Sequence, residues 1–168
     1  IPYFGDGSAW GMSIKYAVEK EPLGTGGAIR NAAQLLETQE SVVILNGDVL
    51  SSHDLSEQIR QHEEHDADVT LHLTQVEDAR AFGCVPTDSQ GRVTAFLEKM
   101  ENPVTNQINA GCYVFNPRVI SSIPLDTVVS VERETFPKLV SSGAKIYGYL
   151  ENTYWLDIGT PKALLKAS

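Results

Sequence analysis

Short apolar runs alternate with amphipathic helical patterns through the first half of the chain, and this alternation limits the fold most. Residues 13–18 alternate polar and apolar side chains as a strand does, and residues 28–36 carry apolar side chains at helical spacing. The continuous apolar run at 42–45 is typical of a strand buried on both faces of a parallel sheet. A helix over 54–65 and a strand over 69–73 follow. This order predicts an open α/β sheet with right-handed crossovers.

In the second half of the chain, the sequence predicts several strands that follow one another without intervening helices. Residues 83–88, 92–98 and 108–115 read as strands, with a turn at Ser89-Gln90-Gly91 between the first two. An antiparallel or mixed portion therefore follows the parallel one. Further elements are expected as a helix over 135–142 that Gly143 ends, a strand over 145–150, and a helix that Thr160 and Pro161 begin.

Composition narrows the class of protein. The 168 residues suit one domain, and the net charge of −9, from 13 Lys and Arg against 22 Asp and Glu, argues against a nucleic-acid partner. No apolar run approaches the roughly 20 residues that cross a bilayer, so no membrane contact is expected. Cys84 and Cys112 each lie in an apolar run, which predicts buried free thiols and a cytoplasmic protein.

A glycine-rich segment, Leu23-Gly24-Thr25-Gly26-Gly27-Ala28, opens a helix after a strand-like run. A glycine turn at a helix N-terminus offers bare backbone N–H groups to an anion or a base edge. The segment does not fit a dinucleotide fingerprint, because the third required glycine position falls on Ile29. The chain also lacks the Gly-Lys pair of a P-loop. A plain strand-to-helix turn remains the alternative reading.

Two carboxylates are candidates for a metal site. Asp48 follows Gly47 at the end of the strand over 42–45, and ligands of open α/β folds bind at such ends. Asp157 precedes the helix that starts near Thr160. Two aspartates on one hard cation would hold Mg²⁺ and leave positions for phosphates and water. The alternatives are a turn-capping aspartate for Asp48 and an ordinary strand-end carboxylate for Asp157.

Polar groups at later strand ends suit a sugar phosphate. Lys99 can meet a phosphate as a point charge, and its neighbour Glu98 can accept from sugar hydroxyls. Asn109 can donate to and accept from a hydroxyl, while Ala110 lets a ligand approach the backbone. Exposed Glu-Lys pairs are common, so this pair is a weak signal by itself.

The histidines give no strong signal. His62 and His65 have a spacing that could hold a metal, but their highly charged surroundings favour a solvent-facing position on the helix over 54–65. That helix has Asp54 as its expected cap, Glu57 as the second half of a capping box, and Leu55 and Ile59 as its core face. His53 and His72 have no partner that the sequence reveals.

Taken in order, these motifs resemble the sugar-phosphate nucleotidylyltransferase family. The similar segments keep the family's order and spacing over nearly the whole chain, at residues 23–28, 46–48, 82–85, 96–99, 109–115 and 155–161. Residues 130–137 are most similar to the mannose-1-phosphate guanylyltransferase group within that family. The resemblance implies a Rossmann-like, GT-A-like nucleotidyltransferase fold, with a mixed sheet flanked by helices.

The resemblance also implies roles for particular residues. Asp48 and Asp157 would bind Mg²⁺ and, with Lys99, form the catalytic set. The nucleotide would contact Glu19, Leu23, Gly24, Thr25 and Gly47. The sugar phosphate would contact Gly83, Glu98, Lys99, Asn109 and Ala110.

Members of this family begin with a strand and a glycine-rich loop whose Arg and Lys grip the triphosphate. We expect that segment to precede Ile1, so that residues 1–168 form an N-terminally incomplete catalytic domain. No hexapeptide repeat is visible, so no C-terminal β-helix is expected within these residues. Without the first strand and the triphosphate loop, this chain alone should turn over negligibly, and its sheet should have unpaired edges.

The implied reaction is transfer of a guanylyl group from GTP to mannose-1-phosphate, giving GDP-mannose and pyrophosphate. A carboxylate at Glu19 can accept from the two adjacent donors of guanine, whereas a pyrimidine edge would leave one carboxylate oxygen unpaired. Glu19 could instead be a solvated charge beside Lys20 and Glu21. Two other functions remain compatible with the sequence: a thymidylyl- or uridylyltransferase acting on glucose-1-phosphate, and a non-catalytic regulatory subunit. The sequence is also compatible with a homo-oligomer.

Overall fold

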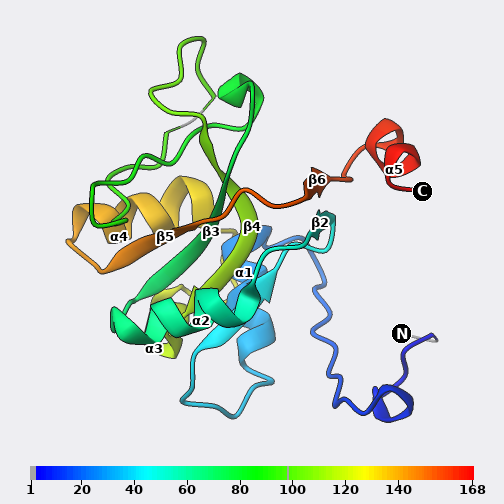
Figure 1. The fold of residues 1–168 in the computed structure, drawn as a ribbon. Coiled ribbons are helices and arrows are strands. Elements are labelled where there is room, and N and C mark those ends of the chain that lie inside the picture. The colour runs from blue at the N-terminus through cyan, green and yellow to red at the C-terminus, as the bar shows by residue number, and fades with distance from the viewer. Residues whose placement is uncertain (1–2, 98) are drawn as a thin grey trace.

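The computed structural model describes residues 3–97 and 99–168, and its centre is a four-stranded mixed sheet (Figure 1). The strand order is β1-β4-β3-β5, with β1 at Val42–Leu45, β3 at Val69–Gln75, β4 at Gln107–Phe115 and β5 at Ile146–Leu150. Strand β4 is antiparallel to both β1 and β3, and β5 is parallel to β3. The expectation of a mixed α/β sheet is therefore confirmed.

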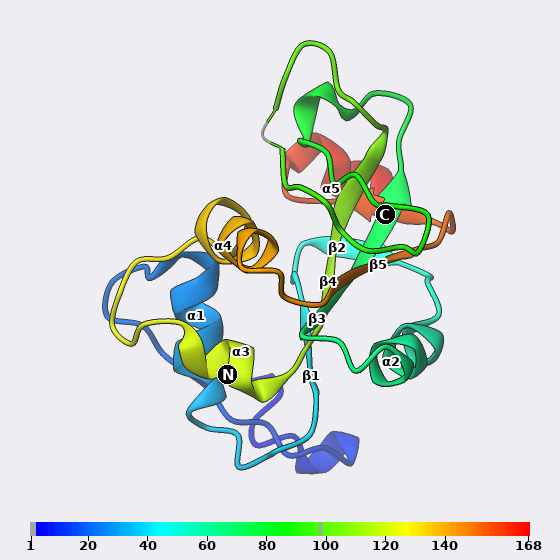
Figure 2. The same cartoon turned by 90° about the vertical axis from the view of Figure 1, so that its left-hand side faces the viewer.

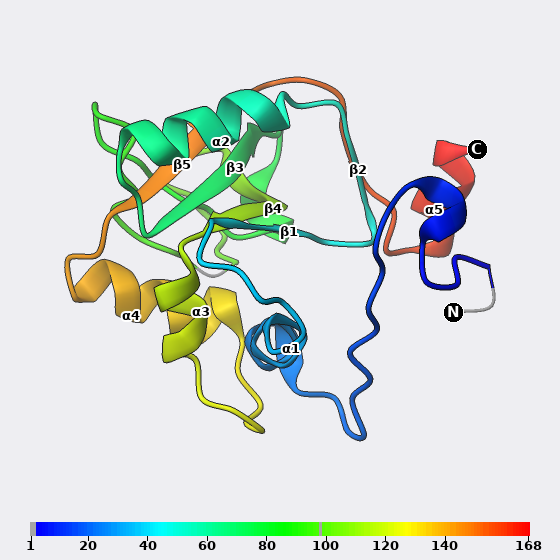
Figure 3. The same ribbon diagram turned by 90° about the horizontal axis from the view of Figure 1, so that it is seen from below.

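Helices cover both faces of this sheet. Helix α2 (Leu55–Glu64) lies on one face, whereas α1 (Gly24–Ala33), α3 (Pro117–Ser122) and α4 (Phe136–Ser141) lie on the other (Figure 3). The short π-helical turn η3 (Val131–Thr135) leads directly into α4. The chain thus forms three layers, with the sheet between the two sets of helices.

The apolar core fills the space between the sheet and the α1/α3/α4 layer. Val69, Leu71 and Leu73 alternate along β3 toward this side and are all fully buried. They belong to one cluster with Phe115 of β4 and Phe136 of α4, whose rings stack with centroids 5.9 Å apart. Burial of each such side chain stabilises the fold by about 1.5–3 kcal/mol.

The opposite side of β3 is buried but polar. Thr70 and His72 point toward α2, where Gln58 and His62 are the buried residues of the helix. The Gln58 side-chain amide donates to the Thr70 carbonyl oxygen at 3.1 Å, and His62 Nδ1 hydrogen-bonds to Thr70 Oγ1 at 2.9 Å. The expected solvent-facing position of His62 is therefore wrong, because α2 turns a polar stripe toward a polar face of β3.

Only one of the two hydrogen bonds of the expected capping box is present at the N-terminus of α2. The Asp54 carboxylate accepts from the Glu57 N–H at 3.0 Å, as expected of an N-cap. The Glu57 carboxylate pairs with Arg60 instead of returning to Asp54. The Asp54 N–H is satisfied by Glu151, whose carboxylate accepts it at 2.8 Å. A long-range contact thus replaces one half of the local motif.

Two expected features of the first half are wrong. Residues 13–18 form no strand but run outside the sheet (Figure 3), because a period-two pattern needs a ladder partner that the described residues do not supply. Within the described chain, β1 pairs only with β4, antiparallel, and Leu45 is 61% exposed. It is thus neither in a parallel pair nor buried on both faces. An apolar run does not specify which neighbours a strand will have.

The segment between β3 and β4 forms loops at one end of the sheet (Figure 2). The expected strands over 83–88 and 92–98 are reduced to isolated bridges, Cys84 with Leu97 and Thr87 with Val93. The turn between them is present, since the Gly91 N–H donates to the Asp88 carbonyl oxygen at 3.1 Å. Pro86 has no N–H to donate, so a regular ladder cannot continue through it.

A second, two-stranded sheet was not expected from the sequence. It joins β2 (Val49–Ser51) to β6 (Trp155–Asp157) in antiparallel register. Helix α5 (Pro161–Ala167) follows β6, and Thr160 caps it by accepting from the Ala163 N–H, as expected. Within the described residues, no helix is both long and apolar enough to span a bilayer.

Candidate active site

Two carboxylates from distant parts of the sequence meet at the second sheet. Asp48 directly precedes β2, and Asp157 is the last residue of β6. The strands pair with Val49 opposite Asp157, and the Ile158 N–H donates to the Asp48 carbonyl oxygen at 2.8 Å. Backbone pairing therefore fixes where the two carboxylates lie relative to each other.

Gly159 marks the space that the carboxylates share. A Cβ atom placed on Gly159 would lie 3.0 Å from Asp48 Oδ2 and 3.1 Å from Asp157 Oδ1. The Gly159 N–H also donates to Asp157 Oδ1 at 2.8 Å, which orients that carboxylate. One oxygen of each aspartate thus borders the same small space, which a larger residue than glycine would fill.

Strand β6 is anchored on the main sheet by Trp155. Its indole N–H donates to the Ala110 carbonyl oxygen of β4 at 3.0 Å, and its ring meets Phe82 edge to face with centroids 5.8 Å apart. The methyl group of Ala110 is buried. The Ala110 carbonyl thus anchors β6, and with it Asp157, on the main sheet.

The chemistry of this pair suits a hard cation. Mg²⁺ prefers oxygen ligands and is usually held by one or two carboxylates together with waters and substrate phosphates. In the described part of the chain, no three His, Cys, Asp or Glu side chains are grouped to enclose a metal ion. The pair could thus hold an ion that takes its remaining ligands from water or substrate.

The glycine turn before α1 packs against the protein itself. Gly24 has φ +70°, and a Cβ atom there would lie 2.7 Å from the Val129 carbonyl oxygen. A Cβ atom on Gly27 would lie 2.5 Å from the Thr127 carbonyl oxygen. The Gly26 N–H donates to Val129 at 2.8 Å, so the expectation of wholly bare N–H groups is wrong. These glycines are required by the close approach of the neighbouring loop.

Two side chains fix the conformation of this turn. The Glu19 carboxylate is half-buried and accepts from the Leu23 N–H at 3.1 Å, so it lies beside the glycines. The Thr25 hydroxyl donates to Glu132 at 3.0 Å and accepts from the Val131 N–H at 2.9 Å. Since the hydroxyl of Thr25 is engaged, any ligand contact by this residue would use its backbone.

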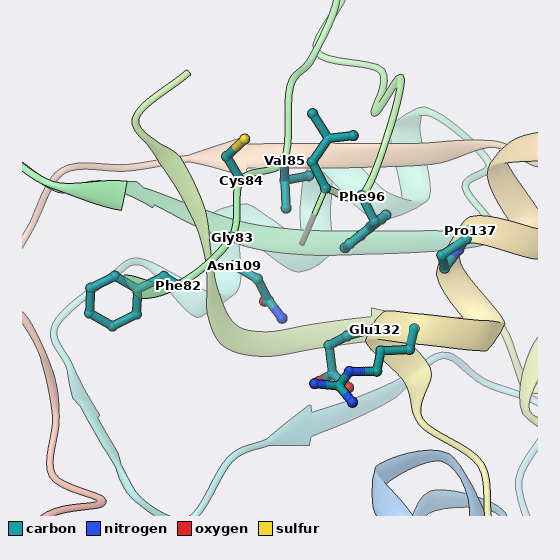
Figure 4. Close-up of a pocket in the computed structure, with 10 residues that line it drawn as sticks. Phe82, Gly83, Cys84, Val85, Phe96, Asn109, Glu132 and Pro137 are labelled. Atoms are coloured by element: carbon teal, nitrogen blue, oxygen red, sulfur yellow. The ribbon is translucent and has the colours of Figure 1, made fainter. Parts of the chain in front are cut away.

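A cavity of about 310 Å³ opens between the 82–85 loop and η3 (Figure 4). Its volume is at the lower end of the range for small-molecule sites. Figure 4 shows Asn109 extending from β4 toward the side of the cavity where Glu132 lies. The lining residues are Phe82, Gly83, Cys84, Val85, Phe96, Leu97, Asn109, Glu132, Arg133 and Pro137.

Two expected sugar-binding residues share this cavity. Gly83 has φ +75°, a conformation that favours glycine and lets the loop turn at the cavity wall. Asn109 is oriented by two hydrogen bonds, since its Nδ2 donates to the Tyr113 hydroxyl at 2.8 Å and its Oδ1 accepts from the Gly111 N–H at 3.1 Å. One amide N–H and one lone pair of Asn109 remain for a ligand.

The remaining expected residues lie elsewhere. Lys99 is exposed and is not among the described lining residues of the cavity. Gly47 is exposed next to Asp48, at the second sheet. Glu98 falls outside the described residues. The structure thus brings most of the other expected residues into three groups: a carboxylate pair, a glycine turn and a cavity.

Comparison with known proteins decides the family. The sequence matches the Nucleotidyl transferase family over residues 2–168. The chain belongs to this family. It is 55% identical over 166 residues to a mannose-1-phosphate guanylyltransferase of Mycobacterium tuberculosis, which covers 98% of this chain and 46% of that protein. A mannose-1-phosphate guanyltransferase beta-A of Xenopus laevis is 36% identical over 157 residues, or 92% of this chain and 43% of that protein. The chain thus spans about half the length of these relatives.

Two solved structures agree with this fold. HddC from Yersinia pseudotuberculosis in complex with GMP-PN is 30% identical and has a TM-score of 0.78 over 92% of this chain and 65% of that one. A putative glucose-1-phosphate thymidylyltransferase from Bacillus anthracis has a TM-score of 0.84 over 99% of this chain and 68% of that one. At 18% identity, the latter supports the fold alone.

One site residue of this nucleotidyl transferase chain was missed in the sequence. Glu132 lines the cavity, and its carboxylate also accepts a hydrogen bond from the hydroxyl of Thr25 in the glycine turn. Its sequence signals were its place in the family-similar stretch 130–137 and its position two residues after Ser130, which caps η3 by accepting from the Arg133 N–H. A first-turn acidic residue usually serves the helix terminus, so the pattern gave no reason to expect a longer-range role.

The cysteines and histidines occupy structural positions. Cys84 and Cys112 are buried free thiols, as expected, and burial raises the pKa of Cys112 to about 11. His53 and His72 stack with ring centroids 4.0 Å apart. His65 stacks on the Tyr147 ring at 4.1 Å.

Proposed function

We propose that the full-length protein containing this chain transfers a guanylyl group from GTP to mannose-1-phosphate. The observation that carries the proposal is the convergence of Asp48 and Asp157 beside Gly159. It is supported by the 55% identity to a relative named mannose-1-phosphate guanylyltransferase. Because the chain spans 46% of that relative, the activity is proposed for the whole protein.

The reaction is an in-line displacement at phosphorus. An oxygen of the sugar phosphate forms a bond to the α-phosphorus of GTP, while the bond from that phosphorus to the β-phosphate oxygen breaks. The products are GDP-mannose and pyrophosphate. Asp48 and Asp157 would hold a Mg²⁺ ion, which supplies positive charge to the phosphates when bound. No protein nucleophile is needed, so the chain contributes mainly by positioning its substrates.

The cavity is the proposed sugar site. Gly83 and Asn109 would face the sugar hydroxyls, with the remaining N–H and lone pair of Asn109 serving as donor and acceptor. Glu98 and Ala110 are proposed as further sugar contacts from the family resemblance. Lys99 would meet the sugar phosphate as a point charge.

The glycine turn is the proposed base site. Leu23, Gly24, Thr25 and Gly47 would surround the nucleotide, with Glu19 reading guanine. The Leu23 N–H holds the Glu19 carboxylate in place, which supports a fixed acceptor at this position. A carboxylate accepts from both the ring N–H and the amine of guanine. Nucleotide substrates and free buried thiols also support a cytoplasmic location.

Pyrophosphate release by the full-length protein tests the proposal. GTP with mannose-1-phosphate should give the highest kcat/KM, compared with UTP or dTTP and glucose-1-phosphate. Asp48→Asn and Asp157→Asn should each lower the rate about 10²–10³-fold, because metal charge stabilisation is worth several kcal/mol. Asp126→Asn, at an exposed residue outside the site, is the matched control. A wild type that prefers another pair of substrates overturns the assignment, and fully active Asp variants remove the metal role.

A further inference from the structure

A carboxylate lies between the glycine turn and the cavity. Glu132 Oε2 accepts from the Thr25 hydroxyl at 3.0 Å and from the Ser130 hydroxyl at 3.1 Å. Glu132 Oε1 accepts from the Tyr113 hydroxyl at 3.3 Å. We call Thr25, Ser130, Glu132 and Tyr113 the Glu132 cluster. Its members come from α1, from η3 and its N-cap, and from β4, so the cluster joins elements that are distant in the sequence.

The cluster continues to the proposed sugar ligand. The Tyr113 hydroxyl donates to Glu132 and accepts from Asn109 Nδ2 at 2.8 Å. With its hydroxyl hydrogen directed at Glu132, Tyr113 can only accept from Asn109, and this fixes which end of the Asn109 amide points toward it. The remaining donor and acceptor of Asn109 are thereby aimed in a defined direction. Glu132 therefore orients Asn109 through Tyr113, and none of the described hydrogen bonds joins the two directly.

The cluster also fixes the glycine turn. The Thr25 hydroxyl donates its hydrogen to Glu132. This leaves the hydroxyl oxygen free to accept from the Val131 N–H at 2.9 Å. Tyr113 is fully buried, and burial together with the Glu132 charge raises its pKa. Hydrogen bonds to a charged acceptor are about twice as strong as neutral ones, and the low dielectric strengthens them further. The cluster is therefore a stiff link.

We propose that Glu132 is a positioning residue that couples the nucleotide turn to the sugar pocket, an inference that rests on the proposed function. An in-line transfer needs the sugar phosphate oxygen and the α-phosphorus held in register, and small displacements of either lower the rate steeply. Glu132 is bonded directly to the glycine turn and, through Tyr113, to the sugar-site residue Asn109, so it keeps the separation of the two sites constant. Loss of Glu132 should loosen both sites at once.

Steady-state kinetics of the full-length enzyme with both substrates varied test the coupling. Glu132→Ala should raise KM for GTP and KM for mannose-1-phosphate, each roughly tenfold or more, because several charge-assisted hydrogen bonds are lost. Glu132→Gln, which keeps an acceptor oxygen but no charge, should recover part of both losses.

Glu134→Ala is the matched control. The Glu134 carboxylate accepts from the Ser130 N–H at 3.0 Å, so it supports the same helical turn, but its recorded bonds do not reach Thr25 or Tyr113. Both KM values should stay near wild type in this variant. The coupling is wrong if Glu132→Ala raises only one KM, or if Glu134→Ala raises both equally.

Hydrogen exchange without substrates separates this inference from the proposed function. In the described hydrogen bonds, the Tyr113 hydroxyl reaches the glycine turn only through Glu132. Tyr113→Phe should therefore speed amide exchange over residues 23–28 in the wild-type background but add nothing to Glu132→Ala. Unchanged exchange in Tyr113→Phe overturns the coupling even in an active enzyme. Faster exchange in a protein that releases no pyrophosphate supports the coupling and rejects only the proposed reaction.

Discussion

Asp48 and Asp157 each place one carboxylate oxygen close to where a Cβ atom on Gly159 would lie, at 3.0 Å and 3.1 Å. Both distances are tighter than ordinary side-chain contacts, so an added methyl group would push the carboxylates apart by a few tenths of an ångström. The hydrogen bond from the Gly159 N–H to Asp157 holds one of them in place.

Gly159→Ala should therefore weaken Mg²⁺ binding about tenfold, as misoriented ligands typically do. Both negative charges remain, so excess Mg²⁺ should restore most of the rate. A Mg²⁺ titration of pyrophosphate release by the full-length enzyme measures this shift. An unchanged Mg²⁺ dependence would show that the ion does not bind between these two aspartates.

Glu19→Gln should relax the choice of base. The amide oxygen can still accept from the Leu23 N–H, so the turn should keep its conformation. The amide cannot accept from both guanine donors, and its own N–H suits a pyrimidine carbonyl. The ratio of kcat/KM for GTP to that for UTP should fall by about 10²-fold. If the ratio does not change, Glu19 has no part in base recognition.

Gly27→Ala should destabilise the fold. Its Cβ would lie 2.5 Å from the Thr127 carbonyl oxygen and 2.6 Å from Leu23 Cβ, so the backbone must move. Overpacking of this kind costs about 1–3 kcal/mol, which thermal unfolding should detect as a lower Tm. Gly47→Ala, with no atom within 4 Å of its Cβ, is the stability control. Equal Tm values for the two variants would contradict the close packing at Gly27.

His72 should make stability fall as the solution becomes acidic. Burial, and then the charge of the stacked His53, lower the pKa of His72 from 6.5 to about 4. The unfolded chain therefore takes up this proton first as the pH drops below 6.5, and the free energy of unfolding decreases until about pH 4. A shift of this size corresponds to about 3 kcal/mol.

Urea unfolding across this pH range tests the role of His72. His72→Leu should flatten the dependence, although buried His62, whose pKa is also lowered by burial, leaves a residual slope. His65→Gln, at an exposed position, is the matched control variant. A wild-type slope in His72→Leu would show that this imidazole does not stay neutral in the folded protein.

Local patterns predicted most of the elements in the main sheet. Strand β3, strand β5 and helix α2 lie where their apolar periodicity and caps placed them. Those signals are short-range, and the residues that produce them lie within the element itself. The prediction of a strand over 13–18 was wrong because a short-range pattern carries no information about whether a pairing partner is present.

The site was predicted in its parts but not in its assembly. Asp48 and Asp157 were candidates from their sequence positions and from the family resemblance, but no local pattern predicted that β2 and β6 would pair to bring them together. The role of Glu132 was also missed, since its contacts to Thr25 and Tyr113 exist only in three dimensions. His62 is buried because it meets a polar face of β3, where it hydrogen-bonds to Thr70. The alternation of side chains along a strand does not by itself tell which face the strand buries, so this contact could not be predicted.

The pairing of β2 with β6 also dictates when the carboxylate pair can exist during synthesis. A nascent chain that has emerged as far as Leu150 contains every strand of the main sheet, yet it lacks Asp157 and the Trp155 anchor. Because domains acquire structure as they leave the ribosome, the sheet can be in place while Asp48 is still without its counterpart. The proposed metal centre can therefore be completed only after all four strands of the main sheet have been synthesised.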